Sequence, residues 1–152
     1  MSRKSLILVI IQFSSFAFFA IVGNLFTINL FWLIIQLLAL GLGFWGIIAM
    51  RIGNFNIQPE IKQHANMVSS GPYKIIRNPM YSGLIIFFCV SVIVNFDVKN
   101  LYFSNLRLLI FIILTTVLNL KIYMEEQFLT DKFGDEYLKF KENTYRLIPF
   151  IY

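Results

Sequence analysis

Charged residues are scarce in this sequence. Only 14% of its 152 residues are Asp, Glu, Lys or Arg, whereas 58% are hydrophobic, and an ordinary soluble domain has about 25% charged residues. A soluble domain of this length buries only about 70% of the surface of its unfolded chain, so it cannot hide this much apolar surface from water. The composition excludes an ordinary soluble domain and predicts a single-domain membrane protein.

Cysteine and histidine are almost absent, since each occurs once. A single cysteine excludes a disulfide framework and a CxxC site, and we interpret Cys89, which lies in an apolar run, as a small buried side chain. We interpret His64 as a solvated loop residue. The sequence therefore predicts no metal site, and it contains no Ser/His/Asp or Cys/His set for nucleophilic catalysis.

Four long apolar segments are present, at residues 6–22, 30–50, 80–96 and 106–123. A helix of about 20 residues crosses a hydrocarbon core of about 30 Å. Arg3 and Lys4 resemble the start of a signal peptide, but no small-residue cleavage site follows, so we expect the first segment to be retained. The sequence predicts an all-α, polytopic integral membrane bundle of about four transmembrane helices.

The positive charges indicate an orientation in the membrane. Arg3 and Lys4 precede the first segment, and the loop 51–79 carries four basic residues against one acidic residue. By the positive-inside rule, the N-terminus and this loop are cytoplasmic, and four spans return the tail 124–152 to the same side. Anionic lipid accounts for the net charge of +5, so no nucleic-acid partner is expected. The Lys- and Ile-rich sequence suggests a bacterial inner membrane.

The stretch GPYKIIRNPMYSG, residues 71–83, differs from its surroundings in containing two prolines, two glycines, two tyrosines and two basic residues. Proline and glycine are ordinary turn residues, because proline fixes φ and glycine permits left-handed conformations. Composition alone therefore favours a simple cytoplasmic turn.

The order of these residues is more specific. GPYKIIRNPMYSG resembles the segment GPYxxxRHPxYxG of the isoprenylcysteine carboxyl methyltransferase family, which comprises membrane enzymes that use S-adenosylmethionine and are related to phospholipid methyltransferases. MVSSG, residues 67–71, is similar to the family's LVTSG-like run, and the tail from residue 125 is similar to its Glu pair followed by FGxEYxxY. These ordered motifs cover about the last hundred residues.

The resemblance implies a cofactor site for S-adenosylmethionine formed by the cytoplasmic loop and tail. A helix that starts near Pro79 presents free amides to an anion such as the cofactor carboxylate, and Glu125 can accept hydrogen bonds from its ammonium or ribose. The cofactor-binding residues implied are Gln58, Ala65, Asn66, Met67, Val68, Tyr73, Asn78, Pro79, Met80, Tyr81 and Glu125.

The sequence has Phe140 where the family pattern FGxEYxxY has its second tyrosine, and it departs from the family at two further positions of the candidate site. Asn78 stands where the family has histidine, and asparagine keeps a donor and an acceptor but cannot become cationic. Lys121 stands where an arginine commonly faces the acceptor. Lys121 is therefore either a substrate-binding residue that holds an acceptor carboxylate, or one half of a simple i,i+4 pair with Glu125.

The expected activity is methyl transfer to a lipophilic acceptor, with Arg77, Tyr81, Glu125 and Lys121 at the reacting centre. A carboxylate acceptor is favoured because it needs no general base, while a small lipophilic amine or thiol is also compatible. The expected partners are the lipid bilayer and a lipophilic or lipidated acceptor; the sequence does not indicate an oligomeric state. Two alternatives stay open: an NADPH-dependent membrane reductase of the sterol-reductase type, and a catalytically degenerate membrane scaffold.

Overall fold

The protein is described by a computed structural model that covers residues 3–22, 24–54 and 67–151, with the side chains of 51–54 excluded. The main helices are α1 Arg3–Ile21, α2 Leu30–Asn54, α3 Pro79–Val94, α4 Leu101–Phe133 and α5 Asp135–Glu142. Two short 3-10 helices, η1 Gly71–Lys74 and η2 Val98–Asn100, precede α3 and α4. Within the described residues there is no β-strand, and the predicted all-α membrane bundle is confirmed.

Three helices are long and apolar enough to cross a membrane. They are Arg3–Ile21, Leu30–Met50 and Val98–Phe133, with mean hydropathies of 1.9, 2.2 and 1.9. The fourth apolar helix, α3, has 16 residues and would reach about 24 Å at 1.5 Å per residue. It begins at Pro79, as proline in the first helical turn allows.

Helix α4 runs without interruption from Leu101 to Phe133, ten residues past the apolar segment seen in the sequence. Its 33 residues correspond to a length of about 50 Å, more than a hydrocarbon core requires. Gly134 then turns the chain into α5 with φ 54°, a value that glycine adopts without steric cost. Glu125 and Glu126 therefore lie on a rigid helix, and not on a loose tail.

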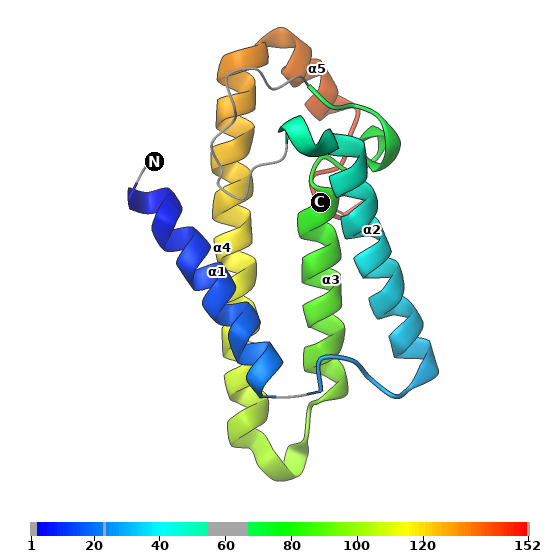
Figure 1. Ribbon diagram of the computed structural model, residues 1–152, viewed down its shortest axis with the longest axis vertical. Coiled ribbons are helices and arrows are strands. Elements are labelled where there is room, and N and C mark those ends of the chain that lie inside the picture. Colours follow the sequence, from blue (N-terminus) through cyan, green and yellow to red (C-terminus); the bar gives the residue numbers. More distant parts are fainter. Residues whose placement is uncertain (1–2, 23, 55–66, 152) are drawn as a thin grey trace.

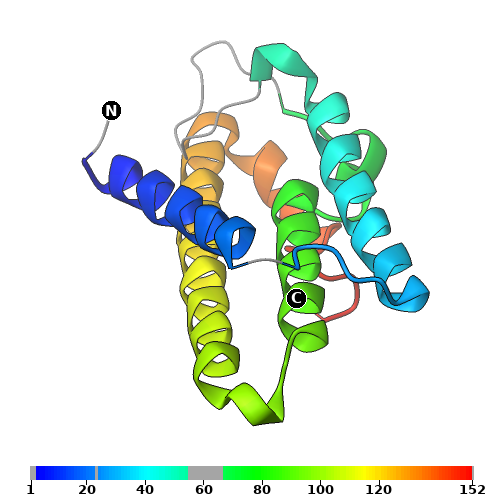
Figure 2. The same ribbon diagram turned by 60° about the horizontal axis from the view of Figure 1, so that its bottom comes forward.

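The four long helices form two packed pairs, in which α2 packs along α3 and α1 packs against α4 (Figure 1). Contacts between α3 and α4 join the pairs, and the view in Figure 2 shows α1 crossing α4 at an angle. The α2–α3 contact is close at Gly83, where an added Cβ would lie 2.4 Å from the carbonyl oxygen of Ala39. Gly43 and Gly46 also face the start of α3, whereas Gly41 has open space beside it.

Aromatic and aliphatic side chains fill the contact between the pairs. Phe88 of α3 stacks on Phe16 of α1 with ring centroids 5.2 Å apart, and it lies 4.8 Å from Phe19. Leu114 and Leu118 of α4 are completely buried in the same cluster. Such packing holds α1, α3 and α4 in fixed relative positions.

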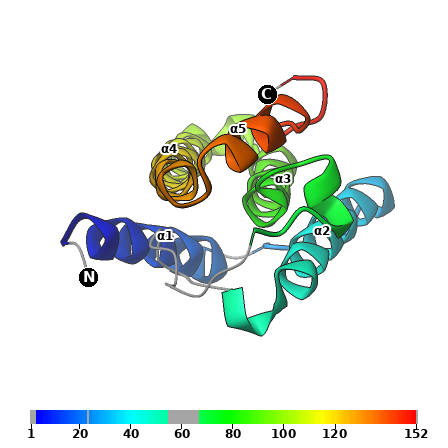
Figure 3. The same cartoon turned by 90° about the horizontal axis from the view of Figure 1, so that it is seen from above.

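The C-terminal segment folds back onto the chain just before α3. The amide of Tyr145 donates to the carbonyl of Ile75 at 2.9 Å, and the amide of Arg77 donates to the carbonyl of Tyr145 at 2.8 Å. Seen from above, α5 lies across the same end of the bundle (Figure 3). The start of α3 and the end of α4 therefore lie next to the tail (Figure 1).

Candidate active site

A tyrosine and a carboxylate meet where α3 begins. Tyr81 lies in the first turn of α3, and its hydroxyl donates a short hydrogen bond to Oε1 of Glu125 on α4. Tyr81 is buried, while Glu125 is half-buried. A carboxylate that is held by one neutral donor keeps acceptor capacity on its other oxygen, so Glu125 can bind a further donor.

One helical turn before Glu125, Lys121 enters the interior of the bundle. Its side chain is almost completely buried, and Nζ donates to Oε1 of Gln12 on α1 at 2.7 Å. The same Nζ lies 5.5 Å from the centroid of the Tyr81 ring, within the range of a cation–π contact. Residues from α1, α3 and α4 thus form one connected polar group inside an apolar bundle.

This polar group borders a cavity of about 290 Å³. The cavity lies between the α1–α4 pair and the α2–α3 pair, and its size is at the lower end of the range for ligand pockets. Most of its walls are aliphatic or aromatic. The lining residues are Gln12, Phe13, Ala39, Leu40, Gly43, Phe44, Ile47, Met80, Tyr81, Gly83, Leu84 and Lys121.

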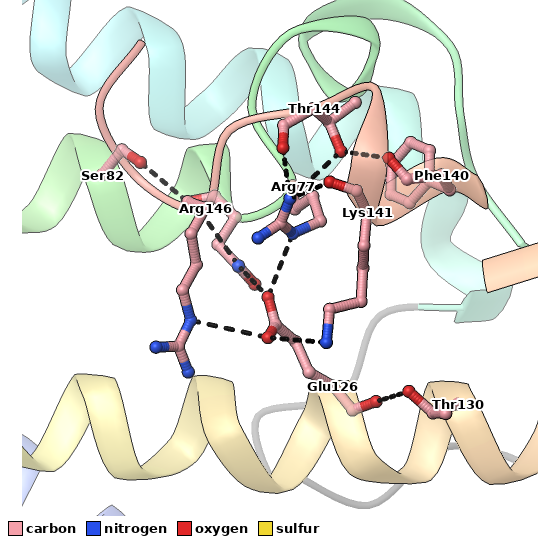
Figure 4. A network of polar contacts seen from close by, with 9 residues as sticks. Arg77, Ser82, Glu126, Thr130, Phe140, Lys141, Thr144 and Arg146 are labelled. Carbon is pink, nitrogen blue, oxygen red and sulfur yellow. Dashed lines mark hydrogen bonds and ion pairs between the residues drawn. The ribbon is translucent and has the colours of Figure 1, made fainter. Parts of the chain in front are cut away.

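A second cluster surrounds Glu126, the next residue along α4 (Figure 4). Its carboxylate is 3.1 Å from Nε of Arg77, 3.5 Å from Nε of Arg146 and 3.9 Å from Nζ of Lys141. Arg77 also donates to the carbonyl oxygens of Lys141, at 2.9 Å, and Thr144. Arg77 and Glu126 therefore bind the C-terminal segment to the α3–α4 junction, and we call this cluster the tail clamp (Arg77, Asn78, Glu126, Lys141, Thr144, Arg146).

Asn78, the residue that departs from the family pattern, belongs to the tail clamp. Its Nδ2 donates to the carbonyl of Arg146 at 3.1 Å and lies 3.5 Å from Oε1 of Glu126. Both contacts need only an N–H donor, which asparagine supplies as well as histidine does. The replacement of histidine therefore leaves this position with a structural role.

Other expected cofactor residues lie near the start of α3. Tyr73 is buried in η1 and its hydroxyl donates to Sδ of Met80 at 3.8 Å. Burial, and secondarily the charge of Glu125, raise the pKa of the Tyr73 phenol above its usual range, so it acts as a neutral donor. Met67 and Val68 are half-buried, and Gln58, Ala65 and Asn66 lie outside the described residues.

The structure thus sorts the expected site residues into two neighbouring sets. Tyr81 contacts both Glu125 and Lys121, and Tyr81 and Lys121 line the cavity. Arg77 and Asn78 instead contact the tail. Gln12 was not singled out from the sequence, although a strongly polar residue in the middle of a membrane-spanning segment is a signal for a buried polar contact. In the described part of the chain, no group of three His, Cys, Asp or Glu side chains could hold a metal ion.

Comparison with known proteins identifies the family of the chain. The model of one family, described as phospholipid methyltransferase, matches residues 21–136. That stretch includes all of α2 and α3 and ends in α5, so it takes in the second span, which the motifs alone did not reach. A search of curated proteins finds no match. The match covers well over half of the chain, and the protein therefore belongs to the phospholipid methyltransferase family of membrane methyltransferases.

Proposed function

We propose that the protein transfers a methyl group from S-adenosylmethionine to a lipophilic acceptor with an acidic head group, in the manner of a carboxyl methyltransferase. Membership of a membrane methyltransferase family supports the reaction class. The observation that carries the choice of acceptor is Lys121, which lines an apolar cavity and whose Nζ lies 5.5 Å from the centroid of the Tyr81 ring. An ammonium group there attracts an anion and repels an amine.

The residues at the start of α3 fit the cofactor chemically. Glu125, a half-buried residue, offers acceptor oxygens for an ammonium or for ribose hydroxyls. Tyr73 and Tyr81 supply aromatic surface and hydroxyl oxygens that can accept, because their O–H groups already donate to Met80 and Glu125. The amides of the first turn of α3 supply donors. A pocket for this cofactor needs such a combination of acceptors, donors and apolar surface.

The cavity fits the apolar part of an acceptor. Its walls are mostly aliphatic and aromatic, and Phe13 of α1 and Phe44 of α2 line it while exposing about half or more of their own surface. In a membrane bundle, exposed apolar side chains face lipid. We infer that the acceptor enters from the bilayer between α1 and α2 with its head group toward Lys121.

In this reaction the residues of the protein orient the acceptor and exclude water. The bound cofactor supplies an electrophilic methyl group on a sulfonium. Lys121 orients the acceptor carboxylate by charge, the apolar walls exclude water, and Tyr81 fixes Glu125 against α3. Alignment and exclusion of water are sufficient because a carboxylate is already ionised and needs no general base.

The distribution of basic residues indicates the orientation of the bundle in the membrane. The start of α1, helix α5 and the C-terminal segment lie toward the same end of the bundle (Figure 1). These parts of the chain carry the basic residues Arg3, Lys4, Lys139, Lys141 and Arg146. We infer that this end, with both termini, faces the cytoplasm.

Calorimetry on the detergent-purified full-length protein tests the proposed function. We expect S-adenosylmethionine to bind, and Glu125→Gln to weaken binding about tenfold, because hydrogen bonds to a charged group contribute about 1.5–3 kcal/mol. Glu142→Gln on the exposed surface of α5 is the matched control and should bind as wild type does. If the folded protein gives no heat with S-adenosylmethionine but binds NADPH, the reductase alternative is correct; if it binds neither, the scaffold alternative is correct.

A further inference from the structure

Gly43 of α2 lines the cavity between the two helix pairs, and its surroundings leave room for a side chain. Among the described residues outside its own helix backbone, a Cβ added at Gly43 would meet only the carbonyl oxygen of Met80, at 4.0 Å. That distance is an ordinary van der Waals contact. The packing of α2 against α3 therefore does not require glycine at position 43.

Two neighbouring glycines have the opposite surroundings. A Cβ at Gly83 would lie 2.4 Å from the carbonyl oxygen of Ala39, and a Cβ at Gly46 would lie 3.0 Å from side-chain atoms of Pro79 and Met80. Such short distances force the backbone or the neighbouring side chains to move. The close contact between α2 and α3 thus explains Gly83 and Gly46, but it does not explain Gly43.

Gly43 lies in the middle of the wall that α2 contributes to the cavity. Helices α2 and α4 lie on opposite sides of α3 (Figures 1 and 3), and α4 contributes Lys121 to the lining. The cavity therefore extends from Lys121 across α3 to the wall of α2. The lining residues of α2 share one helix face, with the spacing of successive turns, and are Ala39, Leu40, Gly43, Phe44 and Ile47.

The missing side chain of Gly43 matters because the cavity is small. Its volume of about 290 Å³ is at the lower end of the range for ligand pockets, about 300–1,000 Å³. One extra or missing methylene in a hydrophobic pocket changes discrimination between ligands about 10–200-fold. An apolar group that extends from Lys121 toward α2 would pass Gly43, where the wall carries no side chain.

We propose that Gly43 is a specificity-determining residue, which sets how bulky an apolar group the acceptor can carry into the cavity. The proposal rests on the proposed function, because the group that Gly43 selects is the apolar part of the proposed acceptor. The selection is steric and comes from the space beside Gly43. A larger side chain at this position should exclude bulky acceptors before it excludes slender ones.

The test compares decanoate with adamantane carboxylate, which have the same head group but carry a slender chain and a compact cage. Affinities for the full-length protein in detergent are measured by calorimetry. Gly43→Ala adds one methyl group to the wall of the cavity. Gly41→Ala is the matched control, because Gly41 lies on the same helix, does not line this cavity and has no described atom within 4 Å of an added Cβ. Comparing variants with one probe cancels the partition of that probe into micelles.

We expect wild type to bind both acids. Gly43→Ala should bind adamantane carboxylate about tenfold more weakly and should change the affinity for decanoate less than about threefold. Gly41→Ala should match wild type with both acids. Gly43→Ala should also unfold at or above the wild-type temperature, because alanine favours a helix and the new Cβ meets no close atom.

Four results would overturn the proposal: wild type binds neither acid, Gly43→Ala leaves both affinities unchanged, it weakens both equally, or Gly41→Ala shows the same loss. A large fall in the unfolding temperature of Gly43→Ala would instead assign Gly43 to helix packing, as for Gly83. Binding of S-adenosylmethionine, measured on the same samples, reports separately on the proposed function. Its absence in wild type contradicts that function, whereas its presence with unchanged acid binding in Gly43→Ala contradicts only the role of Gly43.

Discussion

Glu125 and Glu126 are adjacent in α4 but serve different parts of the site. Glu125 accepts from the hydroxyl of Tyr81, which lines the cavity, whereas Glu126 pairs with Arg77, 3.1 Å away, in the tail clamp. Successive residues of a helix point about 100° apart, so one Glu pair can face two different elements. The two carboxylates should therefore respond differently to substitution.

Removal of the Glu126 charge should destabilise the protein. Arg77 and Glu126 have side chains that are only 11% and 9% exposed, and breaking a buried ion pair by removing one partner costs about 3–5 kcal/mol. We expect Glu126→Gln to lower the unfolding temperature and to expose residues 143–151 to limited proteolysis. An equal loss of stability in Glu125→Gln would contradict the separation of the two roles.

Removal of the Tyr81 hydroxyl should weaken cofactor binding more than it weakens the fold. Tyr81→Phe keeps the ring beside Lys121 and deletes the hydrogen bond to Glu125. We expect about a tenfold weaker affinity for S-adenosylmethionine by calorimetry, because Glu125 loses the contact that orients it. Tyr123→Phe, at an exposed position of α4, serves as the control; an equal effect there would remove the special role of Tyr81.

Addition of one methyl group at Gly83 should separate α2 from α3. The new Cβ would lie 2.4 Å from the carbonyl oxygen of Ala39, and overpacking of this kind costs about 1–3 kcal/mol. We expect Gly83→Ala to unfold at a lower temperature than wild type. Gly41→Ala has no atom within 4 Å of its Cβ and should be neutral or slightly stabilising, since alanine favours a helix.

Substitution of Asn78 should distinguish a clamp role from a cofactor role. Asn78→Leu removes the donor that contacts the carbonyl of Arg146 at 3.1 Å and should cost about 1 kcal/mol in unfolding free energy, because a part-buried hydrogen bond is lost. Asn78→His keeps a donor and should be close to wild type in thermal unfolding. Asn143→Leu, which removes an exposed amide, is the control. If Asn78→Leu leaves stability unchanged while abolishing binding of S-adenosylmethionine, the clamp role is wrong.

Reporter fusions should test the number of spans. With α3 as a full span, a green fluorescent protein fused after Tyr152 should fluoresce in bacterial cells, and alkaline phosphatase fused after Asn100 should be active outside the cytoplasm. The short α3, with 16 residues, would then cross a locally thinned bilayer. Opposite activities at the two sites would contradict the proposed orientation.

The sequence was sufficient for the all-α membrane bundle and for the family, and it marked Tyr81, Lys121 and Glu125 as neighbours of one site. Apolar segments of 17 to 21 residues and motifs in a fixed order are local features, so they can be recognised in the sequence alone. It assigned Glu125 to the site but did not indicate that Glu126 pairs with Arg77, because the rotation of a helix against its neighbours depends on packing. The sequence also did not show where α4 ends, because a helix that continues beyond the membrane becomes polar without ending.

By itself, then, the sequence determined which apolar segments must be removed from water. It also determined the positions of proline, glycine and the motif residues along the chain. Only the tertiary structure decided that Gln12, 109 residues away along the chain, accepts the hydrogen bond of Lys121, and that Arg77 turns to the tail while Tyr81 turns to the cavity. The physical reason is that contacts between distant segments are set by how helix faces pack together. That packing, and not the order of residues, brings one polar group to the end of an apolar cavity.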